Sequence, residues 1–362
     1  MTASVPATPH TIAVYNHKGG VGKTTTSLNL AVCLAAAGHR CLLVDIDPQQ
    51  SSTSILSRSG ASPNLVDVIK KTAVIEDAVH ETFVRNLSII PSTRSLTLLE
   101  SGLDDRVRPN QGLRTLLSFS DRAFDFIVMD CPPAMGMLSL NALVAADSVV
   151  VPTTSGAFSV HGVQRTVETV NALRGGLSPG LVVNGILLSL FEGTQRDLQT
   201  VRDLGNQFPG LLYRNRIRFD HEVQKAEVKR LPSCLHSIGT AATQDYLHFT
   251  AELLGRIHRM RRLPDQDFSH EETIRRMAAA LGEPGFADLS ARASADSAAD
   301  GPDEDPVSAT AKPGRFRRSS RAAAAAALFA AGFLCGGALT YWLGPQIGMA
   351  PLAAAAQDPP AR

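Results

Sequence analysis

Paired cysteines are the first feature that this sequence lacks. Its five cysteines are scattered without a CxxC pair or a metal-ligand spacing, at Cys33, Cys41, Cys131, Cys234 and Cys335. This distribution argues against a disulfide scaffold and a zinc site, and it is typical of a reducing compartment. Residues 1–10 lack a basic start and an apolar run, so no secretory signal peptide is expected. The formal net charge of +1 points to no particular partner.

Apolar, β-rich runs alternate with helical stretches over most of the chain. Residues 11–15 precede a glycine- and threonine-rich loop, residues 27–37 favour a helix, and residues 41–46 form an uninterrupted apolar run. Further strands are expected at residues 87–90, 124–129, 148–151 and 181–190. Continuous apolar strands are typical of a parallel sheet covered on both faces. The sequence therefore predicts a doubly wound, mostly parallel α/β domain over residues 11–256, after a short tail of residues 1–10.

A phosphate-binding loop follows the first expected strand. Residues 17–24 read HKGGVGKT, so His17 stands where the usual G-x-x-x-x-G-K-[ST] pattern has its first glycine. Glycines let backbone N–H groups surround phosphate oxygens, and the following helix presents its positive N-terminus. Lys23 can reach the β- and γ-phosphates, and the Thr24 hydroxyl can ligate Mg²⁺. The predicted ligands are ATP and Mg²⁺, and the predicted nucleotide-binding residues are Lys18, Gly19, Gly20, Val21, Gly22, Lys23, Thr24 and Thr25.

Three aspartates follow two of the expected strands. Asp45 and Asp47 end the strand after the loop, and Asp130 ends a later one. Because the carboxyl ends of parallel strands face the ligand crevice, all three can point toward the same Mg·ATP. The alternative is that one or more of them caps a helix or closes a turn.

These segments resemble the motifs of the ParA/MinD group of ATPases over residues 11–254. KGGVGKTTT at residues 18–26 is similar to the deviant Walker A loop, VDIDPQ at 44–49 to switch I, and MDCPP at 129–133 to Walker B and switch II. The fold implied is that of a P-loop NTPase. A tyrosine kinase of the same group is disfavoured, because only four tyrosines are present and none cluster at the end of the chain.

The resemblance also implies a role for individual residues. Lys18 would reach across a nucleotide-sandwich dimer to the partner's phosphates, and Gly19 would have to be small where the two loops approach. The implied catalytic residues are Lys18, Lys23 and Asp47, with Asp47 positioning the attacking water. Asp130 would hold Mg²⁺ through water, and Asp45 would be an indirect partner of the metal. A solvated surface side chain is the alternative for Lys18.

A slow ATPase that forms a homodimer on binding ATP is the activity implied. A partner, such as a ParB-like protein, would stimulate hydrolysis, and the output would be the placement of chromosome or plasmid DNA or of another large cargo. A second hypothesis is a nucleotide-gated adaptor for an envelope assembly, such as a polysaccharide or secretion complex, with no role for DNA.

Three arginines alternate in the sequence YRNRIRF, at Arg214, Arg216 and Arg218. In an extended segment they would lie on one face, where they could contact DNA phosphates in a salt-dependent way. Surface arginines without a partner are the alternative.

The C-terminal third changes in composition. Residues 257–311 are expected to form a helical and flexible linker, with short helices between 265 and 289, and residues 312–321 are basic. Residues 322–343 contain no charge and are long enough to span a bilayer, which needs ~20 residues.

Three further cues favour a transmembrane helix at residues 322–343. Arginines precede it, Tyr341 and Trp342 lie at its far end, and Gly332 and Gly336 form a GxxxG pair. The sequence therefore predicts a single-pass protein of the bacterial inner membrane, with the ATPase domain in the cytoplasm and residues 344–362 across the membrane. The alternatives are an alanine-rich low-complexity tail and a helix buried in a partner.

Overall fold

The chain divides into two units, Met1–Gly301 and Pro302–Arg362. The computed structural model describes residues 8–57, 61–100, 113–114, 117, 124–156, 158–263 and 268–289. The predicted basic segment, the apolar segment 322–343 and the tail lie outside the described residues, so the transmembrane helix stays a prediction. Within the described part of the chain, no helix has the length and apolar character that crossing a bilayer requires.

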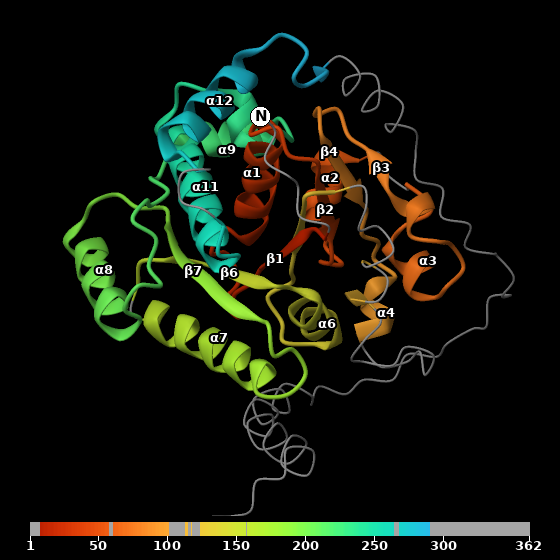
Figure 1. The fold of residues 1–362 in the computed structure, drawn as a ribbon, viewed down its shortest axis with the longest axis horizontal. Helices are drawn as coiled ribbons and strands as arrows, with labels where there is room; N and C mark the ends of the chain where they lie inside the picture. Colours follow the sequence, from red (N-terminus) through yellow and green to blue (C-terminus); the bar gives the residue numbers. More distant parts are fainter. Residues whose placement is uncertain are drawn as a thin grey trace, which may run out of the picture. The chain divides into compact units, whose positions relative to one another are not determined.

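A seven-stranded sheet forms the centre of the described domain, in the order β3-β4-β2-β5-β1-β6-β7 (Figure 1). The strands are β1 (His10–Val14), β2 (Cys41–Asp45), β3 (His80–Glu81), β4 (Leu87–Ile90), β5 (Phe126–Asp130), β6 (Ser148–Thr154) and β7 (Val182–Ser189). All neighbouring pairs are parallel except β3 and β4, which are antiparallel. The predicted mostly parallel sheet is confirmed, and the two-residue strand β3 is too short to leave a pattern in the sequence.

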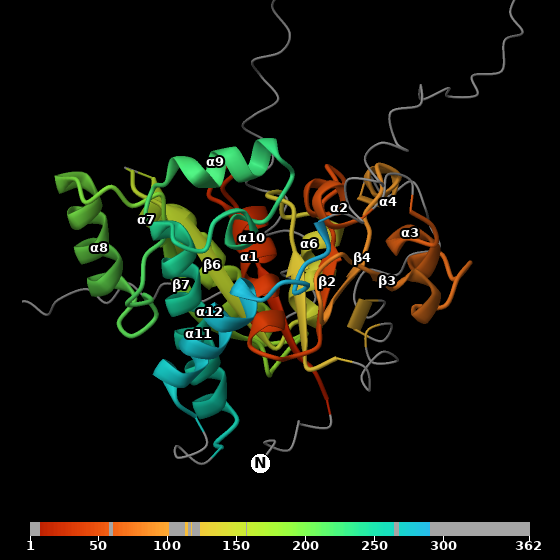
Figure 2. The ribbon, with the colours of Figure 1, turned by 90° about the horizontal axis from the view of Figure 1, so that it is seen from above.

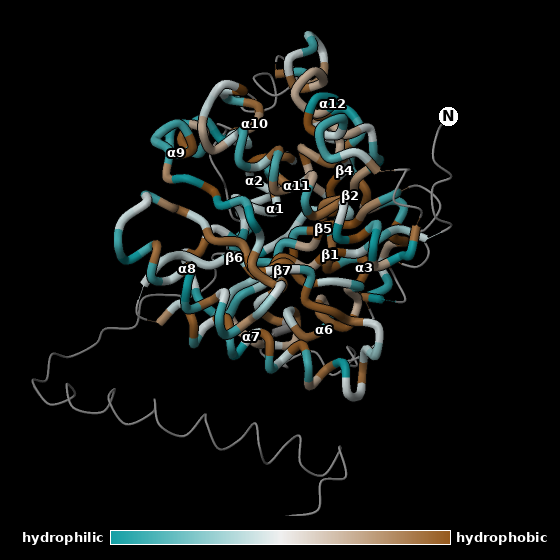
Figure 3. Tube along the Cα trace, turned by 60° about the vertical axis from the view of Figure 1, so that its left-hand side comes forward, coloured by the Kyte–Doolittle hydropathy of each residue, from teal (hydrophilic) through white to brown (hydrophobic). Residues whose placement is uncertain are grey.

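Helices cover both faces of the sheet. They are α1 (Lys23–Ala36), α2 (Ser51–Leu56), α3 (Leu65–Ile69), α4 (Leu96–Glu100), α6 (Met137–Ala145), α7 (Ser159–Arg174), α8 (Gln195–Gln207), α9 (His221–Val228), α10 (Ser233–His236), α11 (Ala241–Met260) and α12 (His270–Gly282). Alternate residues along β1 and just after it belong to two separate core clusters. Ile12 and Val14 belong to the cluster that contains residues of α1, α11 and α12. Ala13 and Tyr15 belong to the cluster that contains residues of α3, α6 and α7. Figure 3 shows the resulting concentration of hydrophobic residues on the central strands, and Figure 2 shows α2 and α9 at the same end of the sheet.

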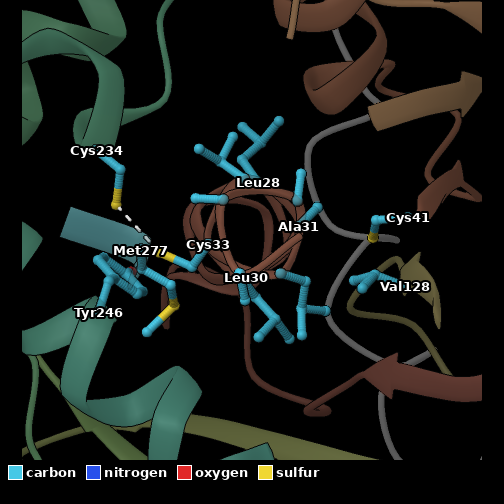
Figure 4. Packing of buried hydrophobic residues seen from close by; sticks show 14 of the residues in the cluster. Leu28, Leu30, Ala31, Cys33, Cys41, Val128, Cys234, Tyr246 and Met277 are labelled. Atoms are coloured by element: carbon cyan, nitrogen blue, oxygen red, sulfur yellow. Dashed lines mark hydrogen bonds between the residues drawn. The ribbon is translucent and has the colours of Figure 1, made fainter. Parts of the chain in front are cut away.

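Helix α1 is almost entirely buried, because apolar residues surround it on several sides (Figure 4). Its Leu28, Leu30 and Cys33 belong to one core cluster with side chains of α10, α11 and α12. The Sγ atoms of Cys33 and Cys234 lie 3.6 Å apart, as two thiols in contact. A helix held on this many sides gives the loop before it a rigid base.

Residues 268–289, which the sequence assigns to a linker, pack on the α/β domain. α12 lies against α1 and α11 and buries Met277 completely. Its buried residues Thr273, Met277, Ala280 and Leu281 recur at helical spacing, so the helix itself leaves a pattern in the sequence. The sequence does not show that this face packs on α1 and α11, which is why it places the end of the domain at residue 256.

The strap, defined here as residues 283–289, continues from α12 to the turn between β3 and β4. The backbone N of Arg85 donates to the carbonyl O of Phe286 at 2.9 Å, and that of Asp288 donates to Phe83 O at 2.7 Å. Phe286 is 1% exposed, and the Arg85 guanidinium lies 5.4 Å from the centre of its ring. The strap therefore joins the last described helix to the far side of the sheet.

Candidate functional site

The predicted phosphate loop joins β1 to α1 at the carboxyl edge of the sheet. Gly20 and Gly22 have φ angles of 70° and 83°, a left-handed conformation that favours glycine. Gly22 is the residue before α1, a helix of 14 residues whose first N–H groups have no partner within the helix. The sequence thus folds locally into a loop that ends on a helix N-terminus, the arrangement that binds phosphate.

Lys23 is the first residue of α1, and its side chain reaches back over the loop. Its Nζ donates to the carbonyl O of Lys18 at 3.0 Å. Burial lowers the pKa of Lys23, while the carboxylates of Asp130 and Asp47 act in the opposite direction. Lys23 is 7% exposed, whereas Lys18 and Gly19 are exposed. The ammonium group of Lys23 is therefore held inside the loop, and the Lys18 side chain is outside it.

Asp45 and Asp130 lie side by side as register partners at the ends of β2 and β5. Both are fully buried, and burial raises the pKa of both carboxyl groups. Asp130 accepts hydrogen bonds from Ser27 Oγ at 3.0 Å and Ser52 Oγ at 2.8 Å. Asp45 accepts from the hydroxyl of Thr53 at 2.7 Å and from its backbone N at 2.8 Å. Asp45 thus fixes the start of α2, which fits its predicted role as an indirect partner of the metal.

Asp47 is half-buried and lines a cavity together with Lys23 and Thr24. One of its carboxylate oxygens accepts from the backbone N of Gln49 at 2.9 Å, so it also closes a turn. Ser92 Oγ donates to the Asp47 carbonyl at 2.6 Å, which fixes the backbone at this position. Of the three predicted aspartates, Asp47 is the one that lines this cavity.

The cavity has a volume of about 720 Å³, within the range of small-molecule pockets. Besides the phosphate loop, its wall contains residues that the sequence did not indicate, from the end of β7, the segment after it, α9 and α11: Ser189, Leu190, Ile217, Phe219, Gln224 and Tyr246. Ser189 follows the rule that strand ends face the ligand, so its position at the end of an expected strand was a usable signal. Tyr246 lies in a helix remote in sequence and carried no such signal.

The residues at this cavity fit a nucleotide with Mg²⁺. Ser189 is 4% exposed and lines the cavity, and its Oγ has no hydrogen-bond partner among the described residues. Buried hydroxyls are nearly always bonded, so this atom indicates a polar ligand. Thr24 and Asp130 supply a hydroxyl and a carboxylate near one another, and oxygen ligands of this kind suit Mg²⁺. His, Cys, Asp and Glu side chains form no cluster suited to a directly held metal within the described ranges.

The three predicted DNA-contacting arginines lie in an extended segment beside the end of β7, as expected, but their surroundings differ. Arg218 makes a two-fold ion pair with Asp245, with both N–O distances at 2.8 Å. Arg216 is half-buried, and its guanidinium lies 5.2 Å from the centre of the Phe191 ring. Arg214 is exposed, and no ion pair of its side chain is found among the described residues. Two of the three arginines therefore have contacts within the chain.

Comparison with known proteins gives a consistent result. A family model described as an AAA domain matches residues 9–183. The chain is 34% identical over 245 residues to the sporulation initiation inhibitor protein Soj of Bacillus subtilis (strain 168), a match that covers 67% of this chain and 97% of that protein. It is 33% identical over 250 residues to the chromosome partitioning protein ParA of Caulobacter vibrioides (strain NA1000 / CB15N), covering 68% and 94%.

Solved structures share the fold. The cobyrinic acid a,c-diamide synthase from Mycobacterium smegmatis with bound ATP analog and magnesium matches with a TM-score of 0.60 at 26% identity, covering 71% of this chain and 98% of that chain.

Proposed function

Because the chain belongs to the ParA/MinD superfamily of P-loop ATPases, we propose that it binds ATP with Mg²⁺, forms a dimer in that state and hydrolyses the nucleotide. The observation that supports this best is the meeting of Lys23, Thr24 and Asp47 on the wall of one cavity at the N-terminus of α1. The ATP analog and magnesium bound to the related synthase agree with these ligands.

Each residue has a distinct part in the proposed reaction. The backbone N–H groups at the start of α1 and the Lys23 ammonium bind the β- and γ-phosphates. Thr24 would ligate Mg²⁺ directly and Asp130 would do so through water, and the ion neutralises phosphate charge when it is bound. Asp47 orients the attacking water and holds the proton that it loses.

Dimerisation rests on Lys18, whose side chain is exposed while its backbone is bound within the loop. We expect Lys18→Ala to weaken the dimer formed with the ATP analogue AMPPNP at least ~10-fold, since a charge-assisted contact to the partner's phosphate is removed. ADP binding should change little, because Lys23 and the loop N–H groups remain. Sedimentation analysis of the full-length chain in a mild detergent measures the first, and titration with a fluorescent ADP measures the second. An AMPPNP dimer of unchanged affinity would overturn the proposed dimer contact.

The cargo that we propose is DNA, since the similar protein from Caulobacter vibrioides is named for chromosome partitioning. Arg214 is the exposed candidate for a phosphate contact. We expect Arg214→Glu to weaken binding to nonspecific duplex DNA and to reduce the salt dependence by roughly one counterion, with Arg196→Glu on α8 as the charge-matched control. Titrations over a series of salt concentrations give both quantities. A wild-type chain that binds no DNA in its AMPPNP form would favour the envelope adaptor instead.

We also propose that residues 322–343 anchor the protein in the bacterial inner membrane, with the ATPase domain in the cytoplasm. The wild-type chain should stay in the membrane pellet after extraction with alkaline carbonate. Leu334→Arg should move it toward the soluble fraction, because an arginine at the centre of such a segment costs about 2.5–3.5 kcal/mol. Release of the wild-type chain by carbonate would contradict the anchor.

A further inference from the structure

Asn16 is a buried residue at the entrance of the phosphate loop that none of the roles above uses. It is 1% exposed, and both ends of its side-chain amide are bonded. Nδ2 donates to the carbonyl O of Pro152 in β6 at 2.8 Å. Oδ1 accepts from the backbone N of Lys18 at 3.1 Å. A single side chain thus connects the backbone of Lys18 to a neighbouring strand of the sheet.

The backbone of Lys18 is held from two sides. Its N–H is bound by Asn16, and its carbonyl accepts from Lys23 Nζ at 3.0 Å. The space beside the next two residues is open, since a Cβ at Gly19 or Gly20 would meet no atom within 4 Å among the described residues. Lys18 is therefore a fixed point at the edge of an open glycine stretch.

Helix α7 passes close to this fixed point. A Cβ on Gly162 would lie 3.6 Å from Asn16 Oδ1 and 4.0 Å from the Cβ of Lys18, which is ordinary contact distance. His17, between the two residues, has its ring nitrogens 3.2 Å from Tyr15 Oη and 3.3 Å from Thr169 Oγ1 of α7. The entrance of the loop is thus tied to β6 through Asn16 and to α7 through His17, while the Lys18 side chain remains exposed.

We propose that Asn16 is a positioning residue that fixes the point from which the Lys18 side chain extends to the partner's phosphate. This inference rests on the dimer contact of Lys18 proposed above. A lysine that must cross an interface loses considerable conformational freedom on binding, and a fixed base reduces that cost. Asn16 binds the N–H of Lys18, whereas Lys23 binds the Lys18 carbonyl, and neither Lys23 nor Thr24 is bonded to Asn16. We therefore expect the loss of Asn16 to affect the dimer contact more than the binding of nucleotide to one chain.

The test compares two affinities in the full-length chain, using the AMPPNP dimer and fluorescent ADP as above. Asn16→Ala should raise the dissociation constant of the dimer about 10-fold and change the ADP affinity by less than about two-fold. Asn184→Ala is the matched control, because Asn184 lies in β7 away from the loop, is 4% exposed and accepts a hydrogen bond from Tyr213. It should lower thermal stability without changing either affinity. A purely structural Asn16 would instead lower the ADP affinity as much as the dimer affinity.

A double-mutant cycle distinguishes a positioning role of Asn16 from a purely structural one. If Asn16 acts through the Lys18 side chain, Asn16→Ala has no further effect on the dimer in a Lys18→Ala chain. Additive losses would overturn the inference. An AMPPNP dimer that is weakened by Lys18→Ala and unaffected by Asn16→Ala overturns this inference alone, whereas a dimer unaffected by Lys18→Ala overturns the proposed contact as well.

A second variant keeps the test decisive if Asn16→Ala does not fold. Asn16→Ser keeps a polar side chain but is too short to join the Lys18 N–H to the Pro152 carbonyl. It should weaken the AMPPNP dimer about as much as Asn16→Ala and change the ADP affinity by less than about two-fold. A dimer of wild-type affinity would overturn the inference.

Discussion

Asp47→Asn is expected to reduce ATP hydrolysis about 100-fold or more while leaving ATP bound. An amide cannot hold the proton that the attacking water loses, and a positioned general base typically contributes at least this factor. The binding contacts of Lys23 and Thr24 do not involve the altered group. The asparagine also keeps an oxygen that can accept from the Gln49 backbone N, so the turn should persist. The Asp47→Asn chain should therefore form with ATP the dimer that the wild type forms with AMPPNP, and this dimer should persist.

Single-turnover measurements with labelled ATP, followed by the lifetime of the ATP dimer, check this expectation. Asp203→Asn on α8 is the control, because it removes the same charge from an exposed position whose recorded bond is to Gln199. Its turnover should equal that of the wild type. An Asp47→Asn chain that hydrolyses ATP at the wild-type rate would show that another group orients the water.

Gly185→Ala is expected to destabilise the folded domain by about 2–3 kcal/mol, an overpacking effect. A Cβ at this position in β7 would lie 2.5 Å from Tyr213 Cε2 and 2.7 Å from Arg256 Nη1. Neither neighbour can move freely. Tyr213 is 1% exposed, and Arg256 stacks 4.1 Å from the centre of its ring while donating to the carbonyls of Asn184, Leu211 and Leu212.

Thermal unfolding of the wild type and the variant should show a loss of roughly 5–10 °C. Gly205→Ala on α8 is the matched control, because a Cβ there meets no atom within 4 Å among the described residues. That change should leave the protein equally stable or raise its stability by about 0.5–1 kcal/mol, since alanine favours a helix over glycine. Equal melting temperatures for Gly185→Ala and wild type would contradict the close packing of β7 against Tyr213.

Local patterns predicted the parallel sheet and the phosphate loop. The loop depends on residues that are consecutive in the chain, and the strands are apolar runs, so both leave a clear record in the sequence. Asp45 and Asp130 could be placed at one edge because the ends of parallel strands meet there, and their register pairing agrees with this.

Features that depend on distant partners could not be predicted in this way. Arg218 is paired with Asp245, 27 residues further on, and its alternation with Arg214 and Arg216 gave no sign of this ion pair. Tyr246 reaches the cavity wall from the second turn of α11, and the packing of that helix on α1 brings it there. The transmembrane prediction and the proposed cargo rest on the sequence and on the similar proteins, respectively.

The strap also determines how a mechanical load at Leu289 would enter the domain. Such a force acts first on the strap, where backbone bonds of Phe286 and Asp288 hold it to the β3–β4 turn. It reaches α12 next, and α12 packs on α1, whose first residue is Lys23. Two attachments thus lie in series between Leu289 and the helix that follows the phosphate loop.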